Sequence, residues 1–381
     1  MKITGAKVLT VDYVFEERDI FTASERISDS SDDGVIIDAG GLYAIPGLVD
    51  IHFHGAVGHD FCDADCEGLR EIAEYEARHG VLAICPATMT LDRERLQKIM
   101  KTAKDYSDTW RSGSKGARLV GVNMEGPFIS PDRIGAQNPE YLHLPDIELF
   151  ESLQYGSGNL IKLLDVAPEL PGCIDLIGKL HDRVNISIAH TNADYAVASE
   201  AFSKGARHMT HLFNAMPGIG HRQPGPVIAA RECGAEVELI TDGIHIHPAV
   251  VRFVFDMFAK DKVCLISDSM EATGLSDGEY ELGGQRVQVS GKRAILSGSK
   301  DTIAGSATNL FDCMITAVKE MGVSFEAAVR ASTENPARSI GIFNDYGSIT
   351  PGKYANIILL DEDFRIRQVI NHGLPTELPV T

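Results

Sequence analysis

The sequence lacks any apolar run of the roughly 20 residues that a membrane-spanning helix needs, although hydrophobic residues make up 44% of its 381 positions. The N-terminal segment MKITGAKVLT lacks both the apolar core and the small-residue cleavage site of a secretory signal peptide. We therefore expect a protein that folds around an ordinary apolar core, has no membrane partner and lies in the cytoplasm.

An excess of basic charge is also missing, because 35 lysines and arginines face 54 acidic residues and leave a net charge of −19. Nucleic acids and anionic membrane surfaces bind basic patches, so the composition argues against both as partners. A small anionic substrate stays compatible with this charge. One or two arginines and oriented backbone N–H groups are enough to bind a phosphate locally.

A disulfide framework is a third absence. The cysteines number seven, an odd count, and are scattered along the chain (Cys62, Cys66, Cys85, Cys173, Cys233, Cys264 and Cys313), which indicates a reducing compartment. The CxxxC pair of Cys62 and Cys66 has no second Cys/His pair at zinc-finger spacing, so we expect ordinary thiols there.

The middle of the chain alternates between short apolar runs and longer helical patterns. The apolar runs are eight in number, at 48–54, 81–88, 119–125, 161–169, 184–190, 207–211, 237–243 and 263–268. Helical patterns follow several of them, at 66–79, 93–106, 171–183, 194–204 and 248–259. Eight strand–helix units close naturally into a barrel, so the pattern predicts an α/β fold of the (β/α)8 TIM-barrel class.

Four other stretches depart from this repeat. Residues 126–158 form a long excursion interrupted by proline and glycine, which is typical of a lid or binding loop, and 279–297 has the pattern of a β-hairpin. Residues 1–46, and the tail after a helix near 324–331, show short strand patterns. We therefore predict a small β domain from 1–47 plus 344–381, and a barrel domain over 48–343.

Candidate metal ligands and acids stand at the ends of the apolar runs. They are His52, His54, Glu125, His190, His211 and Asp268. The carboxyl ends of parallel barrel strands meet at one mouth, so residues far apart in sequence can share one site there. A lone histidine is more often a surface or core residue, but six such residues at strand ends indicate a site.

The residue types in this set suit a catalytic metal. Imidazole and carboxylate ligands favour Zn²⁺ or Fe²⁺, and accept Mn²⁺ or Co²⁺ as well. Alternation along the strand puts His52 and His54 on one side of it. Glu125 ends an otherwise apolar run just before Gly126 and Pro127, and a carboxylate buried there needs a cation.

Several motifs carry a resemblance to a known family. IPGLVDIHFHG resembles the first-strand signature of the amidohydrolase superfamily, and GSITPGKYANIILLD resembles its returning β-sandwich segment. Between them, NMEGPFI, AHTNA, THLFNAMPGIGHRQPG, ITDGIHIHP and LISDSMEATG resemble the N-acetylglucosamine-6-phosphate deacetylases. The resemblance spans nearly the whole chain and implies a TIM barrel with a small β-sandwich domain.

Carried over position by position, the resemblance implies roles for the residues at the barrel mouth. Glu125, His190 and His211 become metal ligands, and Asp268 becomes the catalytic acid and base. His52 and His54 occupy positions that supply a second metal in some relatives and not in others, so the number of divalent ions, one or two per subunit, stays open.

The same resemblance implies a substrate and the residues that contact it. The substrate would be a phosphorylated N-acetyl amino sugar, and relatives form homodimers. The implied contacts are Ala136, Asn214, Ala215, Arg222, His245, Ile303, Ala304 and Gly305. Arg222 is favoured for the phosphate, because a guanidinium offers a charge-assisted fork; whether it serves its own or a neighbouring subunit stays open.

The expected reaction is hydrolysis of an acetamide to a free amine and acetate. A metal activates water and polarises the carbonyl, while Asp268 takes the proton from water and passes it to the leaving amine. His245 or Gln137 could add a hydrogen bond to the developing oxyanion. Alternatives are the galacto epimer as substrate, another amide, or a catalytically silent barrel, although the last would be expected to have lost a ligand or Asp268.

Other histidines are weaker candidates for the site. His208 lies three residues before His211 and should face away from the barrel mouth and pack structurally. His247 is a lesser candidate for substrate contact than His245. His143 and Arg133 lie in the long excursion, where a role in a lid is a hypothesis from position alone.

Overall fold

A computed structural model of the chain describes residues 1–31, 34–111, 113–299 and 301–377. Its central feature is a set of short parallel strands in two sheets, ordered β10-β9-β6 and β11 to β16 in sequence order. The strands are β6 (Leu48–Asp50), β9 (Val81–Ile84), β10 (Arg118–Leu119), β11 (Val122–Met124), β12 (Ile161–Val166), β13 (Asn185–Ile188), β14 (His208–Met209), β15 (Glu236–Ile240) and β16 (Val263–Ile266). Each of the eight apolar runs overlaps at least one of them.

Further hydrogen bonds join the two sheets at both of their junctions. A parallel bridge pairs Ala87, beyond β9, with Asn123 of β11. On the other side, the Asp268 amide donates to the His52 carbonyl at 2.9 Å, and the His54 amide donates to the Ser269 carbonyl at 2.7 Å. The segments that follow β6 and β16 therefore lie side by side, and the parallel sheet is curled.

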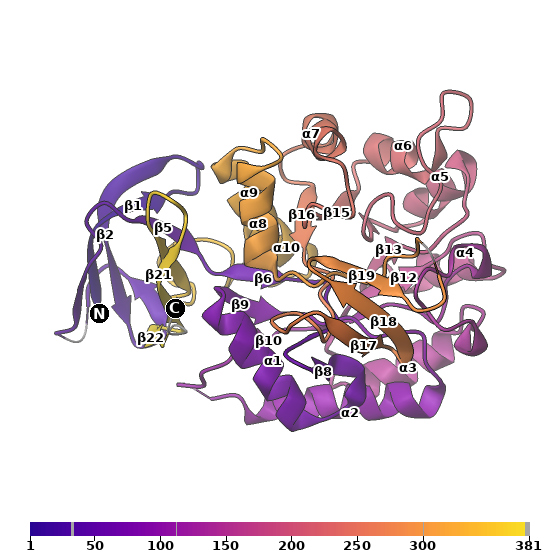
Figure 1. Ribbon diagram of the computed structural model, residues 1–381, viewed down its shortest axis with the longest axis horizontal. Coiled ribbons are helices and arrows are strands. Elements are labelled where there is room, and N and C mark those ends of the chain that lie inside the picture. Colours follow the sequence, from indigo (N-terminus) through magenta and orange to yellow (C-terminus); the bar gives the residue numbers. More distant parts are fainter. Residues whose placement is uncertain (32–33, 112, 300, 378–381) are drawn as a thin grey trace.

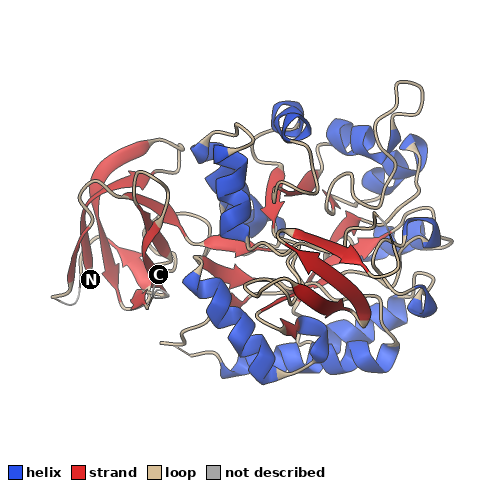
Figure 2. Cartoon of the chain, viewed as in Figure 1, coloured by secondary structure: helices blue, strands red, loops and turns tan. Residues whose placement is uncertain are grey.

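Helices cover the outside of this curled sheet (Figure 2). They are α1 (Cys66–Arg78), α2 (Arg93–Thr109), α4 (Cys173–Leu180), α5 (Tyr195–Ser203), α6 (Gly225–Cys233), α7 (Pro248–Met257), α8 (Leu310–Lys319), α9 (Phe325–Ser332) and α10 (Glu334–Ser339). Side chains cap several N-termini, for example Asp92 on the Arg95 amide and Asn309 on the Asp312 amide. Each helical pattern predicted from the sequence overlaps one of these helices.

Two stretches differ from the sequence-based predictions. The expected hairpin at 279–297 is a three-stranded antiparallel sheet of β17 (Gly278–Leu282), β18 (Gln285–Ser290) and β19 (Arg293–Leu296). The prediction was wrong in strand number because a second turn, with Gly291 at φ +60°, returns the chain once more. The long excursion also contains a regular helix, α3 (Ile147–Gly156), which Asp146 caps and which buries Leu149, Phe150 and Leu153.

Strands from both ends of the chain share an eight-stranded sheet, at the left of Figure 1. Its members are β1 (Lys2–Leu9), β2 (Phe15–Ala23), β3 (Arg26–Ser28), β4 (Ile36–Asp38), β5 (Tyr43–Pro46), β20 (Ile357–Leu360), β21 (Ile366–Asn371) and β22 (Leu374–Thr376). β5 pairs antiparallel with β20 and so joins the N-terminal strands to the C-terminal ones. Ile3, Val8, Ile27, Ile357 and Leu359 belong to a core of its own.

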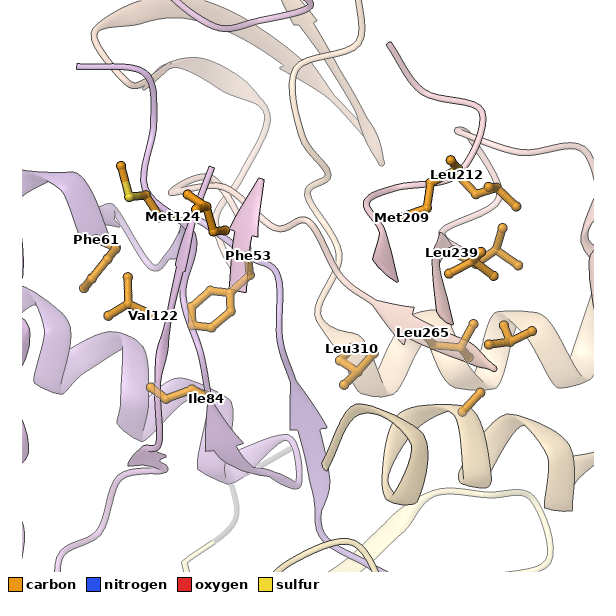
Figure 3. Packing of buried hydrophobic residues seen from close by; sticks show 14 of the residues in the cluster. Phe53, Phe61, Ile84, Val122, Met124, Met209, Leu212, Leu239, Leu265 and Leu310 are labelled. Carbon is orange, nitrogen blue, oxygen red and sulfur yellow. The ribbon is translucent and has the colours of Figure 1, made fainter. Parts of the chain in front are cut away.

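The main core lies between the curled sheet and its helices (Figure 3). Phe53 packs there with Ile84, Val122 and Met124, and the same cluster includes Leu265. Burying one such side chain stabilises the fold by about 1.5–3 kcal/mol. Phe53 therefore anchors the segment that also carries the two histidines beside it.

Within the described part of the chain, no helix is long and apolar enough to cross a membrane.

Candidate metal centre and active site

Six predicted site residues lie just beyond the carboxyl ends of parallel strands, and all of them are buried. Each follows its strand by one to four residues: His52 and His54 follow β6, Glu125 follows β11, His190 follows β13, His211 follows β14, and Asp268 follows β16. The curl of the sheet brings these residues, which span more than half of the chain, into one centre.

Glu125, His190 and His211 form the tightest group in this centre. The Oε1 atom of Glu125 lies 3.0 Å from His190 Nε2 and 3.2 Å from His211 Nε2, and the two Nε2 atoms are 3.2 Å apart. His190 Nδ1 donates to the carbonyl of Arg133 at 2.9 Å, which leaves Nε2 as the free lone pair. Nitrogen and oxygen lone pairs that converge at such distances fit a bound cation.

Glu125 also belongs to a second group, with His52 and His54. His54 Nε2 lies 3.5 Å from Glu125 Oε2, and His52 Nε2 lies 3.6 Å from Glu125 Oε1. Among the described residues, the buried Nε2 atom of His52 has no hydrogen-bond partner. The chain thus presents two donor sets that share one carboxylate, enough for one or two ions.

Electrostatics in the centre favour a cation. Burial opposes ionisation of Glu125, but His52, His190 and His211 outweigh it and hold the pKa of Glu125 well below its usual range. Burial likewise lowers the pKa of His52, but Glu238 and Glu125 outweigh it and raise that pKa well above its usual value. A metal ion bound here would take the place of the protons that these carboxylates attract.

Asp268 faces the same centre from the end of β16. Its Oδ1 atom lies 3.3 Å from His54 Nε2 and 3.7 Å from His52 Nε2, and the residue is 8% exposed. Burial opposes its ionisation, yet the hydrogen bond from His54 and the nearby His52 outweigh that cost and lower the pKa of Asp268. Asp268 is therefore a carboxylate that can accept a proton at the edge of the centre.

The backbone at three of these positions adopts the left-handed conformation. φ is +41° at His190, +26° at His211 and +49° at Asp268. Non-glycine residues in this region cost about 1–3 kcal/mol each and cluster at functional sites. The strained turns aim these side chains inward at the points where the strand ladders stop.

Two neighbours hold Glu125 in place. Gln137 Nε2 donates to Glu125 Oε2 at 2.7 Å, and Gln137 Oε1 accepts from the Thr90 amide at 2.7 Å. Gly126 has φ +80°, and a Cβ there would lie 2.2 Å from Thr90 Oγ1. The close approach of Thr90 therefore requires glycine directly after the carboxylate. Gln137, named from the sequence as a hydrogen-bond donor, donates to Glu125 in this structure.

A cavity of about 250 Å³ opens onto the centre. His54, Glu125, His190, His211 and Asp268 line it, while His52 is fully buried and is not part of the lining. The predicted substrate contacts on its wall are Ala136, Asn214, Ala215, His245, Ile303 and Gly305. Ala304 is fully buried and outside the lining. The structure thus brings most of the predicted contacts to one cavity.

Arg222 is not brought to this cavity. It is exposed and lines a separate cavity of about 700 Å³, together with Arg133, Asn192 and Tyr195. The sequence-based assignment placed Arg222 on the substrate phosphate, and within a single chain the structure leaves it outside the pocket that holds the other contacts.

His245 has a fixed orientation in the cavity wall. Its Nδ1 atom donates to Asp242 Oδ2 at 2.8 Å, and Asp242 Oδ1 accepts from the amides of Ile244 and His245. Burial opposes protonation of His245, but Asp242 outweighs it and raises the pKa of His245. The pair can therefore present a hydrogen-bond donor to an oxygen atom in the cavity.

Sequence reasoning missed several residues of the site. Gly135, Met89, Leu282, Asp301 and Thr302 also line the cavity, and Leu282 and Thr302 come from β17 and the loop after β19. No local pattern marks these residues. Glu238, a fully buried carboxylate in β15 that accepts a hydrogen bond from His52, did carry a signal, because it is a charged residue inside an otherwise apolar run.

The weaker candidates have other roles. His208 is fully buried, and its Nδ1 atom lies 3.0 Å from Ser187 Oγ. His247 caps α7 by accepting from the Ala249 amide, and His143 is exposed in the long excursion. Cys62 and Cys66 are free thiols and belong to neither of the metal-binding groups found among the described residues.

Comparisons with known proteins agree with this geometry. A family model described as "Amidohydrolase family" matches residues 43–375. The N-acetylglucosamine-6-phosphate deacetylase of Bacillus subtilis (strain 168) is 38% identical over 335 residues, which cover 86% of this chain and 83% of that protein. The N-acetylgalactosamine-6-phosphate deacetylase of Escherichia coli O157:H7 is 32% identical over 331 residues, covering 86% of each.

A solved structure shares the whole fold. It is a mutant of N-acetyl-D-glucosamine-6-phosphate deacetylase from Mycobacterium smegmatis in complex with N-acetyl-D-glucosamine-6-phosphate, 29% identical, with a TM-score of 0.89 and 98% of both chains covered. The family is metal-dependent, in agreement with the histidine and glutamate groups described above. The chain is an enzyme and belongs to the amidohydrolase family.

Proposed function

We propose that the protein hydrolyses the acetamide of N-acetyl-D-glucosamine 6-phosphate to D-glucosamine 6-phosphate and acetate. One observation carries the proposal: a single cavity joins Asp268 and a buried His/Glu centre to Asn214, Ala215 and His245 on its wall. The relative from Bacillus subtilis, at 38% identity, supports the same substrate.

Glu125, His190 and His211 would hold a divalent metal, and His52 and His54 could hold a second. Zinc or iron suits this mixture of imidazole and carboxylate, with manganese or cobalt as substitutes. When bound, the metal would lower the pKa of a water molecule and polarise the amide carbonyl.

Asp268 carries the protons in this proposal. Its carboxylate accepts a proton from the attacking water as the C–O bond forms, and then delivers that proton to the nitrogen as the C–N bond breaks. The products are acetate and the sugar amine, and Asp268 returns to its ionised form. His245, oriented by Asp242, would donate a hydrogen bond to the substrate.

Among the described residues, no lysine or arginine lines this cavity, so the permanent positive charge that favours a bound phosphate would come from elsewhere. We propose a homodimer in which Arg222 lies close enough to a phosphate to bind it, in its own or the neighbouring subunit. The exposed position of Arg222 in a second cavity supports this arrangement. We also propose a cytoplasmic location, because a charged sugar phosphate does not cross membranes freely.

For the fold, we propose that the curled sheet is a (β/α)8 barrel over 48–343, and that 1–47 and 344–381 form a small β-sandwich domain. The hydrogen bonds between the segments after β6 and β16 support a closed sheet. The eight-stranded sheet with its separate core supports the small domain through residue 377; residues 378–381 lie outside the described residues.

A second candidate is deacetylation of the galacto epimer, which the relative from Escherichia coli at 32% identity favours. An acetate-release assay separates the two. The purified protein is given N-acetylglucosamine 6-phosphate, N-acetylgalactosamine 6-phosphate and both unphosphorylated sugars. We expect the highest kcat/KM with the phosphorylated gluco sugar. A higher value with the galacto epimer would favour the second candidate, and no acetate from any of them would overturn the proposal in favour of another amide.

A further inference from the structure

Glu238 lies beneath the candidate metal centre and contacts two of its ligands. It belongs to β15 and is 0% exposed. Its Oε2 atom accepts a hydrogen bond from His52 Nδ1 at 2.9 Å and another from the backbone amide of His211 at 3.1 Å. One carboxylate oxygen therefore connects a member of each ligand group.

The hydrogen bond to His52 decides which ring nitrogen is available. An ionised carboxylate only accepts hydrogen bonds, so the proton of His52 lies on Nδ1 and Nε2 keeps its lone pair. That Nε2 atom points toward Glu125 Oε1 at 3.6 Å and Asp268 Oδ1 at 3.7 Å. It has no hydrogen-bond partner in the described part of the chain. The histidine is oriented as a ligand.

A merely structural role does not account for Glu238. Its Oε1 atom is buried and lacks a hydrogen-bond partner among the described residues, and it lies 3.9 Å from His208 Nδ1. Leaving a buried carboxylate so poorly satisfied is unfavourable. A metal ion bound to His52 Nε2, on the other side of the imidazole ring, would stabilise the negative charge of Glu238. In return, a carboxylate that accepts a hydrogen bond from a ligating histidine makes that histidine a more basic ligand.

We propose that Glu238 is a positioning residue that sets His52 as an Nε2 ligand and thereby retains a second metal ion at His52, His54 and Glu125. The inference rests on the proposed metal centre. Glu238 would then determine whether the protein binds one ion or two, although its side chain contacts neither the ions nor the substrate.

The test measures metal binding without substrate. Wild-type protein and the Glu238→Gln variant are stripped of metal and reloaded with Co²⁺, and metal per chain, chelator competition and the visible spectrum are recorded. We expect two ions in the wild type. In Glu238→Gln we expect the second ion to bind about 10–100-fold more weakly, while the first ion, held by Glu125, His190 and His211, keeps its affinity.

Two controls separate positioning from general damage to the fold. Asp165→Asn changes another fully buried carboxylate, in β12, which accepts a hydrogen bond from Thr210 Oγ1 at 2.9 Å, and this variant should retain both ions. In a His52→Ala background, Glu238→Gln should cause no further weakening at the second position. If Glu238→Gln does not fold, Glu238→Asp keeps the charge, shortens the reach and undergoes the same measurements.

Several results would overturn the inference: equal affinity for both ions in Glu238→Gln, a single ion in the wild type, or an added loss in the His52→Ala background. Because no substrate is present, the result is independent of the proposed reaction. A protein that binds two ions and releases no acetate would overturn the proposed function and leave the role of Glu238 standing.

Discussion

The eight-stranded terminal sheet and the curled parallel sheet contrast in how their strands end. In the terminal sheet, β1 and β2 are 8 and 9 residues long and pair over most of their length. In the curled parallel sheet, β14 is only 2 residues long, and the chain beyond it turns through a left-handed residue, His211. The terminal sheet thus contains long paired strands, whereas the parallel sheet contains a strand that stops after two residues.

The chemistry lies where the ladders stop. His190, His211 and Asp268 all sit past a strand end on left-handed backbone, and several buried polar atoms nearby lack a protein partner among the described residues. The terminal sheet carries apolar residues such as Ile357 in its core. The contrast teaches that the parallel sheet accepts strained backbone to hold its buried polar centre, while the terminal sheet contributes an apolar core.

The sharpest test of this contrast is Asp268→Asn. The change keeps the side-chain volume and removes the proton carrier, so we expect turnover to fall by about 10²–10⁴-fold, with melting temperature and metal content close to those of the wild type. Acetate release, thermal unfolding and elemental analysis check the three quantities. Turnover within a few-fold of the wild type would remove Asp268 from the mechanism.

A matched pair of core truncations tests the other side of the contrast. Ile357→Ala in β20 removes a fully buried side chain, so the free energy of unfolding should fall by about 2–5 kcal/mol, with unchanged metal content and turnover per folded molecule. Leu265→Ala in β16, equally buried, should lower stability similarly and also lower turnover, because Asp268 is three residues away. Urea unfolding and acetate release measure both, and a loss of turnover in Ile357→Ala would break the contrast.

Much of the centre could be predicted from the sequence because it depends on strand ends. A polar residue that closes an apolar run is visible in the sequence, and parallel topology then brings such ends together. That logic covers His52, His54, Glu125, His190 and His211. It applies because two features can be read from the sequence. One is the alternation of side chains along a strand, and the other is the strand–helix order that makes neighbouring strands parallel.

The remainder depends on tertiary contacts. Met89 and Leu282 line the cavity from a strand-end loop and from the separate sheet of β17 to β19, and their sequence neighbourhoods do not say where those segments pack. The hydrogen bond from His52 to Glu238 spans 186 positions. The same holds for Arg222. Its motif suggested a phosphate contact, but the path of the loop determines which cavity the side chain lines.

Arg222→Ala tests whether this exposed residue serves the site at all. A hydrogen bond to a charged group contributes about 1.5–3 kcal/mol, so KM for the phosphorylated sugar should rise by about 10–100-fold, with little change for the unphosphorylated sugar. Gln223→Ala, in the same loop and lining the same cavity, is the control and should leave both KM values unchanged. Equal effects of Arg222→Ala on the two sugars would remove it from the phosphate.

The last prediction concerns the pH dependence of stability, in Glu76→Gln. Glu76 is fully buried in α1, and neither carboxylate oxygen has a hydrogen-bond partner among the described residues. Burial, with Asp50 and Asp312 nearby, raises the pKa of Glu76 well above its usual value, so the folded protein keeps a proton that the unfolded chain releases. Below the pKa of Glu76 in the unfolded chain, near 4.5, Glu76 is protonated in both the folded and the unfolded protein, so its ionisation does not lower the free energy of unfolding.

As pH rises above that point, Glu76 should make the wild type lose stability by about 1.4 kcal/mol per pH unit, until the folded pKa is reached. Glu76→Gln removes this loss, so its advantage over the wild type should grow with pH in urea unfolding measured from pH 4.5 to 7.5. Glu74→Gln, half-buried on the same helix, should follow the wild-type curve. A pH-independent difference between Glu76→Gln and the wild type would show that Glu76 is ionised in the folded protein, balanced by a partner such as a buried cation.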